Sequence, residues 1–341
     1  MTHHAMHDIL ALLADKKNLP REMATRAFQI IMNGGATPAQ MAAFVTALRI
    51  KGETVDEITA GATAMRVKAK PIKAPEGAID PCGTGGDAKG TFNISTAVAF
   101  VLAACGVPVA KHGNRAVSSA AGSADVLAAL GVNLDAEIPV LERCLNELGI
   151  AFLMAPKFHP AVRHIAPVRQ ELGFRTVFNL LGPLVNPAAP DYQLMGVYDK
   201  KWVEPCAQVL GELGVRRAWV VHGNDGLDEL TLNGASTVAE LKDGKVRVFT
   251  LTPEEAGLEN APLEAIKGGD AEHNAKALQE ALSGMDNAYR RAVLYNAAAG
   301  LVIAGKATDL KEGVALAAQA IDSGKAYNIL MKFSELSHTR I

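Results

Sequence analysis

Gly83-Thr84-Gly85-Gly86-Asp87 is a glycine-rich turn, and it is the most informative stretch of this 341-residue sequence. Two more polar clusters follow it, Asn93-Ile94-Ser95-Thr96 and the run from Lys111 to Ser119, each at a junction between apolar segments. Glycines let the backbone approach an anion closely, and successive N–H groups in such a turn point at its charge. Three clusters of this kind predict a pocket for a phosphorylated ligand.

Helices are expected directly after the polar clusters. Asn93 or Ser95 is placed to cap a helix whose apolar body runs from 97 to 102, so the positive end of its dipole would face the ligand. The same pattern recurs at Ser118-Ser119, before the apolar residues 126–130. The turn does not have the Gly-x-Gly-x-x-Gly spacing, and no ribose carboxylate is well placed downstream. Dinucleotide binding is therefore disfavoured.

The remainder of the chain predicts an α/β fold. Short apolar runs at 107–110, 150–154, 194–198 and 218–221 are separated by helical patterns, which indicates a mainly parallel sheet with helices packed around it. In such sheets ligands bind beyond the carboxyl ends of the strands. The turns at Gly83, Lys111 and His222-Gly223 are expected at that edge.

The first 70 residues predict helices instead. Thr37 and Gln40, and Thr54 and Glu57, have capping-box spacing, and Gly52 is placed to end the first of these two helices. The proline-rich segment 70–75 is the best domain boundary. We therefore expect a small helical domain over residues 1–73 and an α/β domain over residues 74–341.

Bulk properties exclude several classes of function. The net charge of −2 provides no general attraction to nucleic acid or to acidic membranes. No apolar run reaches the roughly 18 residues that a membrane span needs, and the N-terminus has no signal-peptide pattern. The four scattered cysteines include no Cys-x-x-Cys pair. A cytoplasmic location is the expectation.

Specific motifs resemble those of the anthranilate phosphoribosyltransferases, over nearly the whole chain and in the family's order. Besides the glycine turn and Asn93–Thr96, they are Lys111-His112-Gly113-Asn114-Arg115, Gly122-Ser123-Ala124-Asp125, Phe158-His159-Pro160, Pro167-Val168-Arg169, residues 175–184 and residues 223–229. The resemblance implies a nucleoside phosphorylase/phosphoribosyltransferase-like fold whose helical domain is completed by about residues 159–190. It also implies transfer of a phosphoribosyl group from 5-phosphoribosyl 1-diphosphate to anthranilate, in tryptophan biosynthesis.

The same resemblance implies residue roles. The phosphoribosyl diphosphate site would comprise Gly83, Gly86, Asp87, Thr91, Asn93, Ile94, Ser95, Thr96, Lys111, His112, Gly113, Asn114, Arg115, Ala116, Val117, Ser118, Ser119 and Ser123. Gly83, Asn114 and Arg169 would bind anthranilate, and Ser95, Asp228 and Glu229 would bind Mg²⁺. His112, Phe158, His159 and Pro183 would line an aromatic channel.

Acid–base catalysis is not required by this chemistry. The anthranilate amine carries a usable lone pair at neutral pH, so positioning and electrostatic stabilisation should dominate. His112 is the one candidate proton acceptor, ranked below a role in shaping the pocket.

Assembly into a homodimer is a further expectation. Ile30-Ile31-Met32 and Phe44-Val45 provide more apolar surface than one helix face needs, which favours a partner surface. The resemblance likewise implies a dimer joined through the helical domains.

Two other functions stay open at this point. A pyrimidine nucleoside phosphorylase would share the fold, but it needs neither the Asp228-Glu229 pair nor Arg169. A non-catalytic relative that binds nucleic acid would need a basic stripe, and the sequence has none. Phosphorolysis of uridine without metal, or salt-sensitive DNA binding, would identify them.

Overall fold

The computed structural model describes residues 2–116 and 120–340. Four helices come first: α1 (Thr2–Ala14), α2 (Arg21–Met32), α3 (Pro38–Lys51) and α4 (Val55–Lys68). Thr37 and Thr54 each form a complete capping box, with Gln40 and Glu57 respectively, and the chain leaves α3 at Gly52, as predicted. No helix in the described part of the chain is long and apolar enough to span a membrane.

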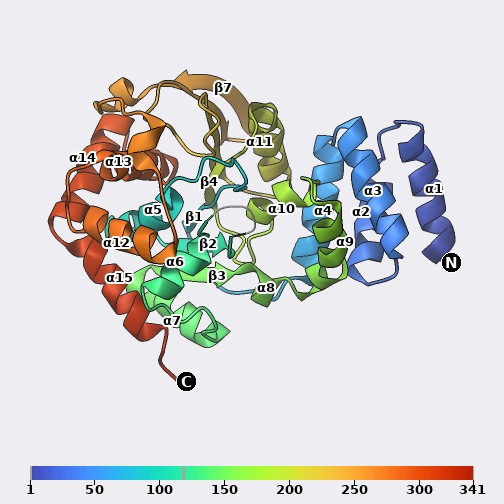
Figure 1. The fold of residues 1–341 in the computed structure, drawn as a ribbon, viewed down its shortest axis with the longest axis horizontal. Helices are drawn as coiled ribbons and strands as arrows, with labels where there is room; N and C mark the ends of the chain where they lie inside the picture. Colours follow the sequence, from blue (N-terminus) through green and yellow to red (C-terminus); the bar gives the residue numbers. More distant parts are fainter. Residues whose placement is uncertain (1, 117–119, 341) are drawn as a thin grey trace.

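A seven-stranded sheet forms the centre of the large domain (Figure 1). Its strands are β1 (Ile79–Pro81), β2 (Val109–Gly113), β3 (Ile150–Met154), β4 (Tyr192–Gly196), β5 (Arg217–Gly223), β6 (Ser236–Lys242) and β7 (Lys245–Leu251). The order is β3-β2-β1-β4-β5-β6-β7. The first five are parallel, which confirms the mainly parallel sheet, and β6 and β7 are antiparallel.

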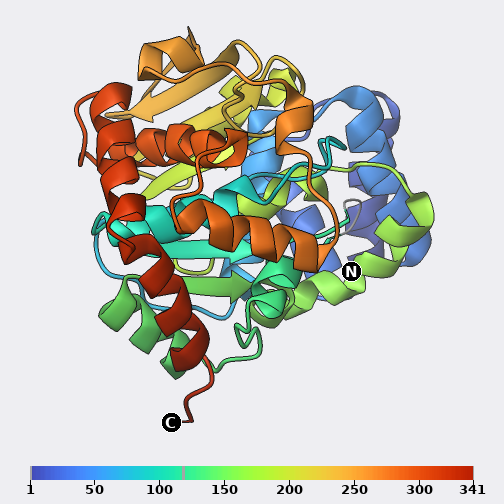
Figure 2. The same cartoon turned by 60° about the vertical axis from the view of Figure 1, so that its left-hand side comes forward.

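Helices cover both faces of the sheet. In chain order they are α5 (Ile94–Ala104), α6 (Ser123–Ala129), α7 (Ile138–Leu148), α8 (Ala155–Phe158), α9 (Ala166–Leu172), α10 (Phe178–Leu184), α11 (Val203–Glu212), α12 (Ala271–Leu282), α13 (Ala288–Ile303), α14 (Leu310–Asp322) and α15 (Lys325–Leu336). Short 3₁₀ turns occupy Pro160–His164, Lys200–Trp202, Pro253–Ala256 and Leu263–Ile266. Figure 2 shows the C-terminal helices lying across one side of the sheet.

Alternation along the strands divides the core in two. Trp219 and Val221 of β5 pack with α5 and the C-terminal helices, whereas Ala218 and Val220 point to the other face. That second core is continuous with the buried residues of α1–α4 and of α9–α11. The small domain is therefore joined to the sheet by apolar packing. Helices α9 and α10 lie beside α3 and α4 (Figure 1).

The apolar residues expected to face a partner lie inside the protein. Phe44 is fully buried, and its ring meets that of Phe28 edge-on with centroids 5.2 Å apart. Ile31 is also fully buried, and Ile30 and Met32 are nearly so. The expectation that these residues form an exposed patch is wrong, because four short helices packed together bury more than one face of each.

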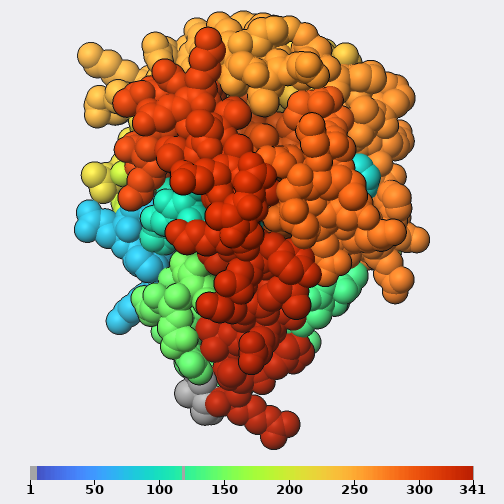
Figure 3. Space-filling model, turned by 90° about the vertical axis from the view of Figure 1, so that its left-hand side faces the viewer, coloured from blue at the N-terminus to red at the C-terminus, as the bar shows by residue number. Residues whose placement is uncertain are grey.

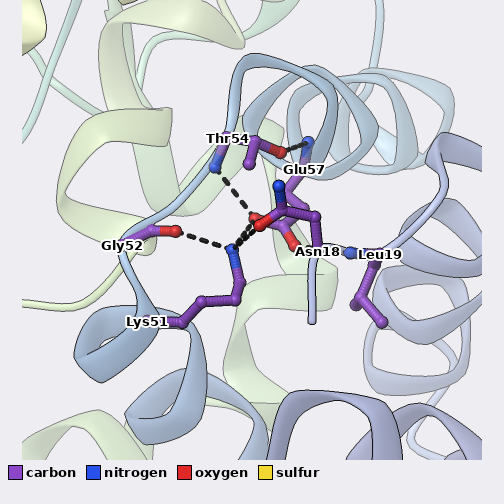
Figure 4. A network of polar contacts seen from close by, with 6 residues as sticks. All are labelled: Asn18, Leu19, Lys51, Gly52, Thr54 and Glu57. Carbon is purple, nitrogen blue, oxygen red and sulfur yellow. Dashed lines mark hydrogen bonds and ion pairs between the residues drawn. The ribbon is translucent and has the colours of Figure 1, made fainter. Parts of the chain in front are cut away.

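Residues at the junction of α3 and α4 form a buried polar network (Figure 4). The Glu57 carboxylate accepts hydrogen bonds from the backbone N–H of Leu19 and of Thr54 and pairs with Lys51 Nζ, each at 2.9 Å. Lys51 Nζ also donates to Asn18 Oδ1 at 3.0 Å. Both charged side chains are almost completely buried. The network fixes the turn between the two helices.

Candidate active site at the carboxyl edge of the sheet

The glycine turn leaves the sheet directly after β1. Gly85 and Gly86 adopt positive φ angles of 64° and 74°, a conformation that side-chain-bearing residues seldom adopt. Thr84 N–H donates to the Gly196 carbonyl at 2.8 Å, and Gly85 N–H donates to Asp228 Oδ2 at 2.8 Å. The turn is thereby attached to the ends of β4 and of the segment that follows β5.

Close approach explains two of the glycines. A Cβ atom on Gly83 would lie 2.7 Å from Asp228 Oδ2, and one on Gly196 would lie 1.6 Å from the Asp228 carbonyl oxygen. Side chains at either position would push the Asp228 segment away. Gly196 was expected only as part of the strand at 194–198 and was given no role at the site, since a single glycine at a strand end is a weak signal.

Three carboxylates gather where these segments meet. Asp228 N–H approaches Asp87 Oδ2 at 3.5 Å, while Asp87 Oδ1 accepts from Lys89 N–H. The pKa of Asp228 is raised, mainly by burial and next by the negative charge of Asp87. The pKa of Glu229 is also raised, mainly by burial and next by the negative charge of Asp228. A cation would stabilise such a group. No set of three or more His, Cys, Asp or Glu side chains within residues 2–116 and 120–340 forms a metal cage by itself, so a cation here would take further ligands from a substrate.

Lys111 and Ser95 border the carboxylates. Lys111 is buried, and its Nζ donates to the Pro81 carbonyl at 2.6 Å and to Ser95 Oγ at 3.2 Å. Ser95 lies in the first turn of α5, whose N-terminus opens toward the same edge. Its bond to Ser95 Oγ orients that hydroxyl, and its positive charge favours the ionised form of the nearby Glu229 carboxylate.

Capping of α5 differs from the expectation. Asn93 occupies the N-cap position, but its side chain makes no capping bond. Its Nδ2 donates to the Ala121 carbonyl, and its Oδ1 accepts from Asn274 Nδ2 at 3.0 Å. The Asn93 side-chain amide, which local spacing predicted to cap the helix, is thus hydrogen-bonded to residues distant in the sequence.

The neighbours of Asn93 that were expected to bind the phosphoribosyl diphosphate are buried or half-buried. Ile94 and Thr96 are buried within α5, so their side chains pack into the core. Thr91 forms an isolated antiparallel bridge with Lys267.

The second polar loop joins β2 to α6. Asp125 accepts from the N–H groups of Ala116 and Gly122 at 2.9 and 3.0 Å and pairs with Arg115 at 2.8 Å. The helix begins at Ser123, later in the chain than the expected cap at Ser118-Ser119. Val117, Ser118 and Ser119 lie outside the described residues. Gly113 and Asn114 lie at the start of the loop, half-buried and exposed respectively.

Two buried histidines lie below that loop. The rings of His112 and His159 meet edge-on at 5.1 Å, and His112 Nδ1 lies 2.9 Å from the Gly182 carbonyl, which makes it the protonated nitrogen. Burial lowers the pKa of His112 to about 3 and that of His159 to about 4. Both rings are neutral at pH 7. His112 is thus a poor proton acceptor, in line with a role in shaping the pocket.

Asp80 supports the same region from within the sheet. Its carboxylate accepts from His112 N–H at 3.1 Å and from Asn186 Nδ2 at 2.7 Å. Burial raises its pKa to about 7. This residue was missed from the sequence, although an acid three residues before the first glycine of the turn is a signal that could have indicated it.

Arg169 projects from α9 on the helical-domain side. It is half-buried, its guanidinium lies 5.5 Å from the centroid of the Phe178 ring, and burial lowers its pKa. It forms no ion pair with any described residue. A partly desolvated, unpaired guanidinium suits a carboxylate ligand. Phe158, also expected near the aromatic ligand, is fully buried in the core of the large domain.

Comparisons with known proteins agree along the whole chain. Residues 7–69 match the family described as "Glycosyl transferase family, helical bundle domain", and residues 75–327 match "Glycosyl transferase family, a/b domain". The anthranilate phosphoribosyltransferase of Rhodospirillum rubrum is 58% identical, over 97% of this chain and 95% of its own.

Solved structures extend the similarity. Anthranilate phosphoribosyltransferase from Thermus thermophilus has a TM-score of 0.92 at 47% identity, covering 97% of this chain and 99% of its own. The enzyme from Saccharomyces cerevisiae, in complex with PRPP and Mg, has a TM-score of 0.88 at 28% identity and covers 97% of each chain.

Proposed function

The chain belongs to the anthranilate phosphoribosyltransferase family, and we propose that the loops at the carboxyl ends of β1, β2 and β5 carry its reaction. The protein transfers the phosphoribosyl group of 5-phosphoribosyl 1-diphosphate (PRPP) to the amine of anthranilate, with release of pyrophosphate, in tryptophan biosynthesis. The carrying observation is the convergence of the glycine turn, the start of α5 and the Asp228-Glu229 pair at one edge of the sheet.

PRPP is proposed to lie across the glycine turn and the loop after β2. The positive-φ glycines Gly85 and Gly86, which let a ligand approach the backbone closely, and the positive end of α5 are suited to its phosphates. Arg115, whose guanidinium is exposed and already oriented by Asp125, adds positive charge on the other side.

Asp228, Glu229 and Ser95 would hold magnesium together with the phosphates of PRPP. The clustered carboxylates with raised pKa values and the oriented Ser95 hydroxyl form the oxygen-rich donor set that this hard cation prefers. Magnesium, when bound, would neutralise charge developing on the leaving pyrophosphate. The protein's own part is to keep these ligands in place and to hold the ribose and the amine in line.

Anthranilate is proposed to approach from the helical-domain side. Arg169 would bind its carboxylate in two-pronged geometry, with Asn114 and the Gly83 backbone as further polar contacts. His112 and His159 are buried and neutral, and their pKa values are low. They would therefore shape the pocket for the aromatic ring without accepting a proton from the anthranilate amine.

The test is an assay of pyrophosphate release from PRPP, with and without anthranilate and with and without magnesium. Release is expected only when anthranilate and magnesium are both present. Phosphorolysis of uridine in the absence of metal would instead indicate a nucleoside phosphorylase, and no product under any condition would refute the proposal.

A matched pair of variants tests the metal ligands. Glu229→Gln should reduce turnover by at least two powers of ten while the protein remains folded, because the residue serves an open site. Glu272→Gln, the same change at an exposed position of α12, should retain wild-type turnover. Equal turnover in the two variants would remove Glu229 from the site.

The protein is further proposed to be a cytoplasmic homodimer. Two-fold dimers are the commonest closed assembly, and the helical domain is the surface suggested by resemblance. Sedimentation velocity at micromolar concentration should show twice the 35.8 kDa chain mass. A single 35.8 kDa species would contradict the dimer.

A further inference from the structure

The C-terminal helices, in red and deep orange, cover much of one side of the molecule (Figure 3). Among them, α13 packs against both α5 and the strand β5. Its residue Asn296 is fully buried, and it lies beside the segment that carries the carboxylate pair. This helix contains no part of the motifs that identify the family in the sequence analysis.

The Asn296 side chain forms two hydrogen bonds with the backbone of Leu230, the residue that follows Glu229. Its Oδ1 accepts from Leu230 N–H at 3.0 Å, and its Nδ2 donates to the Leu230 carbonyl at 3.1 Å. Leu230 lies outside any strand, so this side-chain amide does what a neighbouring strand would otherwise do. The third bond of the amide, Nδ2 to the Ala292 carbonyl at 3.0 Å, holds it on its own helix.

Tyr289 makes the corresponding contact to the other side of the site. Its hydroxyl donates to the Asn93 carbonyl at 3.1 Å, two residues before Ser95. Positions 289 and 296 are two helical turns apart and therefore share one face of α13. The same helix thus holds the segments that carry Ser95 and Glu229.

We propose that α13 is a brace that sets the distance between Ser95 and the Asp228-Glu229 pair, with Asn296 and Tyr289 as positioning residues for magnesium. This inference rests on the proposed function. Hydrogen-bond partners behind metal ligands orient them, and loss of such partners commonly lowers metal affinity by roughly 10–100-fold. A stiff helix between the two segments transmits any change at one end to the other.

Conservative variants separate positioning from stability. Tyr289→Phe removes one hydroxyl and keeps the aromatic ring, whose centroid lies 4.6 Å from that of the Phe92 ring. Tyr295→Phe is its matched control, because the buried Tyr295 hydroxyl, on the same helix, has no hydrogen-bond partner in the described structure. Asn296→Leu removes the two side-chain bonds to Leu230. Asn133→Leu is its control, since the Asn133 side chain also bonds backbone groups, donating from Nδ2 to the Ser337 carbonyl at 3.1 Å and accepting from Asp135 N–H at 3.0 Å, at a position after α6.

The experiment is calorimetric titration of each folded variant with PRPP, without anthranilate, at a series of magnesium concentrations. Tyr289→Phe and Asn296→Leu should raise the magnesium concentration needed for half-maximal binding by about 10–100-fold, with both controls at the wild-type value. The double variant should shift less than the product of the two single shifts, because both act on one distance.

Two failures are distinguishable. If Tyr289→Phe binds PRPP with wild-type magnesium dependence, or if the controls shift as much, the brace is refuted while the proposed function stands. If the wild-type protein binds PRPP independently of magnesium, the proposed metal site is refuted, and the brace with it.

Discussion

Arg169 combines partial burial with the absence of a protein counter-ion in the described chain. Arg169→Ala should raise the KM for anthranilate by roughly 10–100-fold, because a charge-assisted hydrogen bond is worth about 1.5–3 kcal/mol. The KM for PRPP should change little. Arg163→Ala, at an exposed position in the preceding turn, is the control, and steady-state kinetics in both substrates is the measurement. Equal weakening of both substrates would contradict the assignment.

The paired histidines predict a pH dependence of stability. Burial lowers the pKa of His159 from an ordinary 6.5 to about 4. Between pH 6.5 and pH 4, His159 therefore binds a proton in the unfolded chain but not in the folded protein. The stabilising contribution is complete above pH 6.5 and declines as pH falls toward 4. At pH 5 the loss is about 2 kcal/mol.

His159→Gln removes that titration. The gap in unfolding free energy between wild type and variant should therefore shrink by about 2 kcal/mol from pH 7 to pH 5, measured by urea denaturation. The variant must be compared with the wild type at each pH, because a second group titrates in the same range. Burial raises the pKa of Asp80 to about 7, so protonation of Asp80 stabilises both folded proteins as pH falls. A gap independent of pH would show that His159 becomes charged in the folded protein.

At the scale of elements, the turn between α3 and α4 depends on one ion pair. Glu57→Gln leaves Lys51 Nζ buried without its counter-charge, and loss of one partner from a buried pair typically costs about 3–5 kcal/mol. Urea denaturation should show that loss. Glu147→Gln, which breaks the exposed pair between Arg143 and Glu147 on α7, is the control and should leave the midpoint unchanged. Equal midpoints for both variants would contradict the argument.

At the scale of the whole molecule, the position of Phe44 changes the test of assembly. Phe44→Glu buries an unpaired carboxylate within the helical domain, so it should unfold that domain rather than release intact monomers. Circular dichroism melting should show an early loss of helix. A cooperatively folded, monomeric Phe44→Glu protein would instead place Phe44 at a subunit surface.

Local chemistry explains which parts of the fold were predictable. The capping boxes at Thr37 and Thr54 lie within four residues, and the apolar runs that became β2, β3, β4 and β5 are short and bounded by turns. The β6–β7 hairpin was missed, although Asp243-Gly244 at its turn is a known hairpin signal. The strand β1, with three residues, is too short for any periodicity.

The sequence by itself determined the family, the parallel sheet and the polar clusters at its edge, because glycine turns, caps and apolar runs act over a few residues. Only the tertiary structure decided that Lys111 turns inward to Ser95, that Phe44 is core, and that Asn93 is held by Asn274 and Tyr289. The last two partners lie more than 180 residues from Asn93 along the chain. Contacts at such separations depend on how the helices pack against the sheet, and no local pattern encodes them.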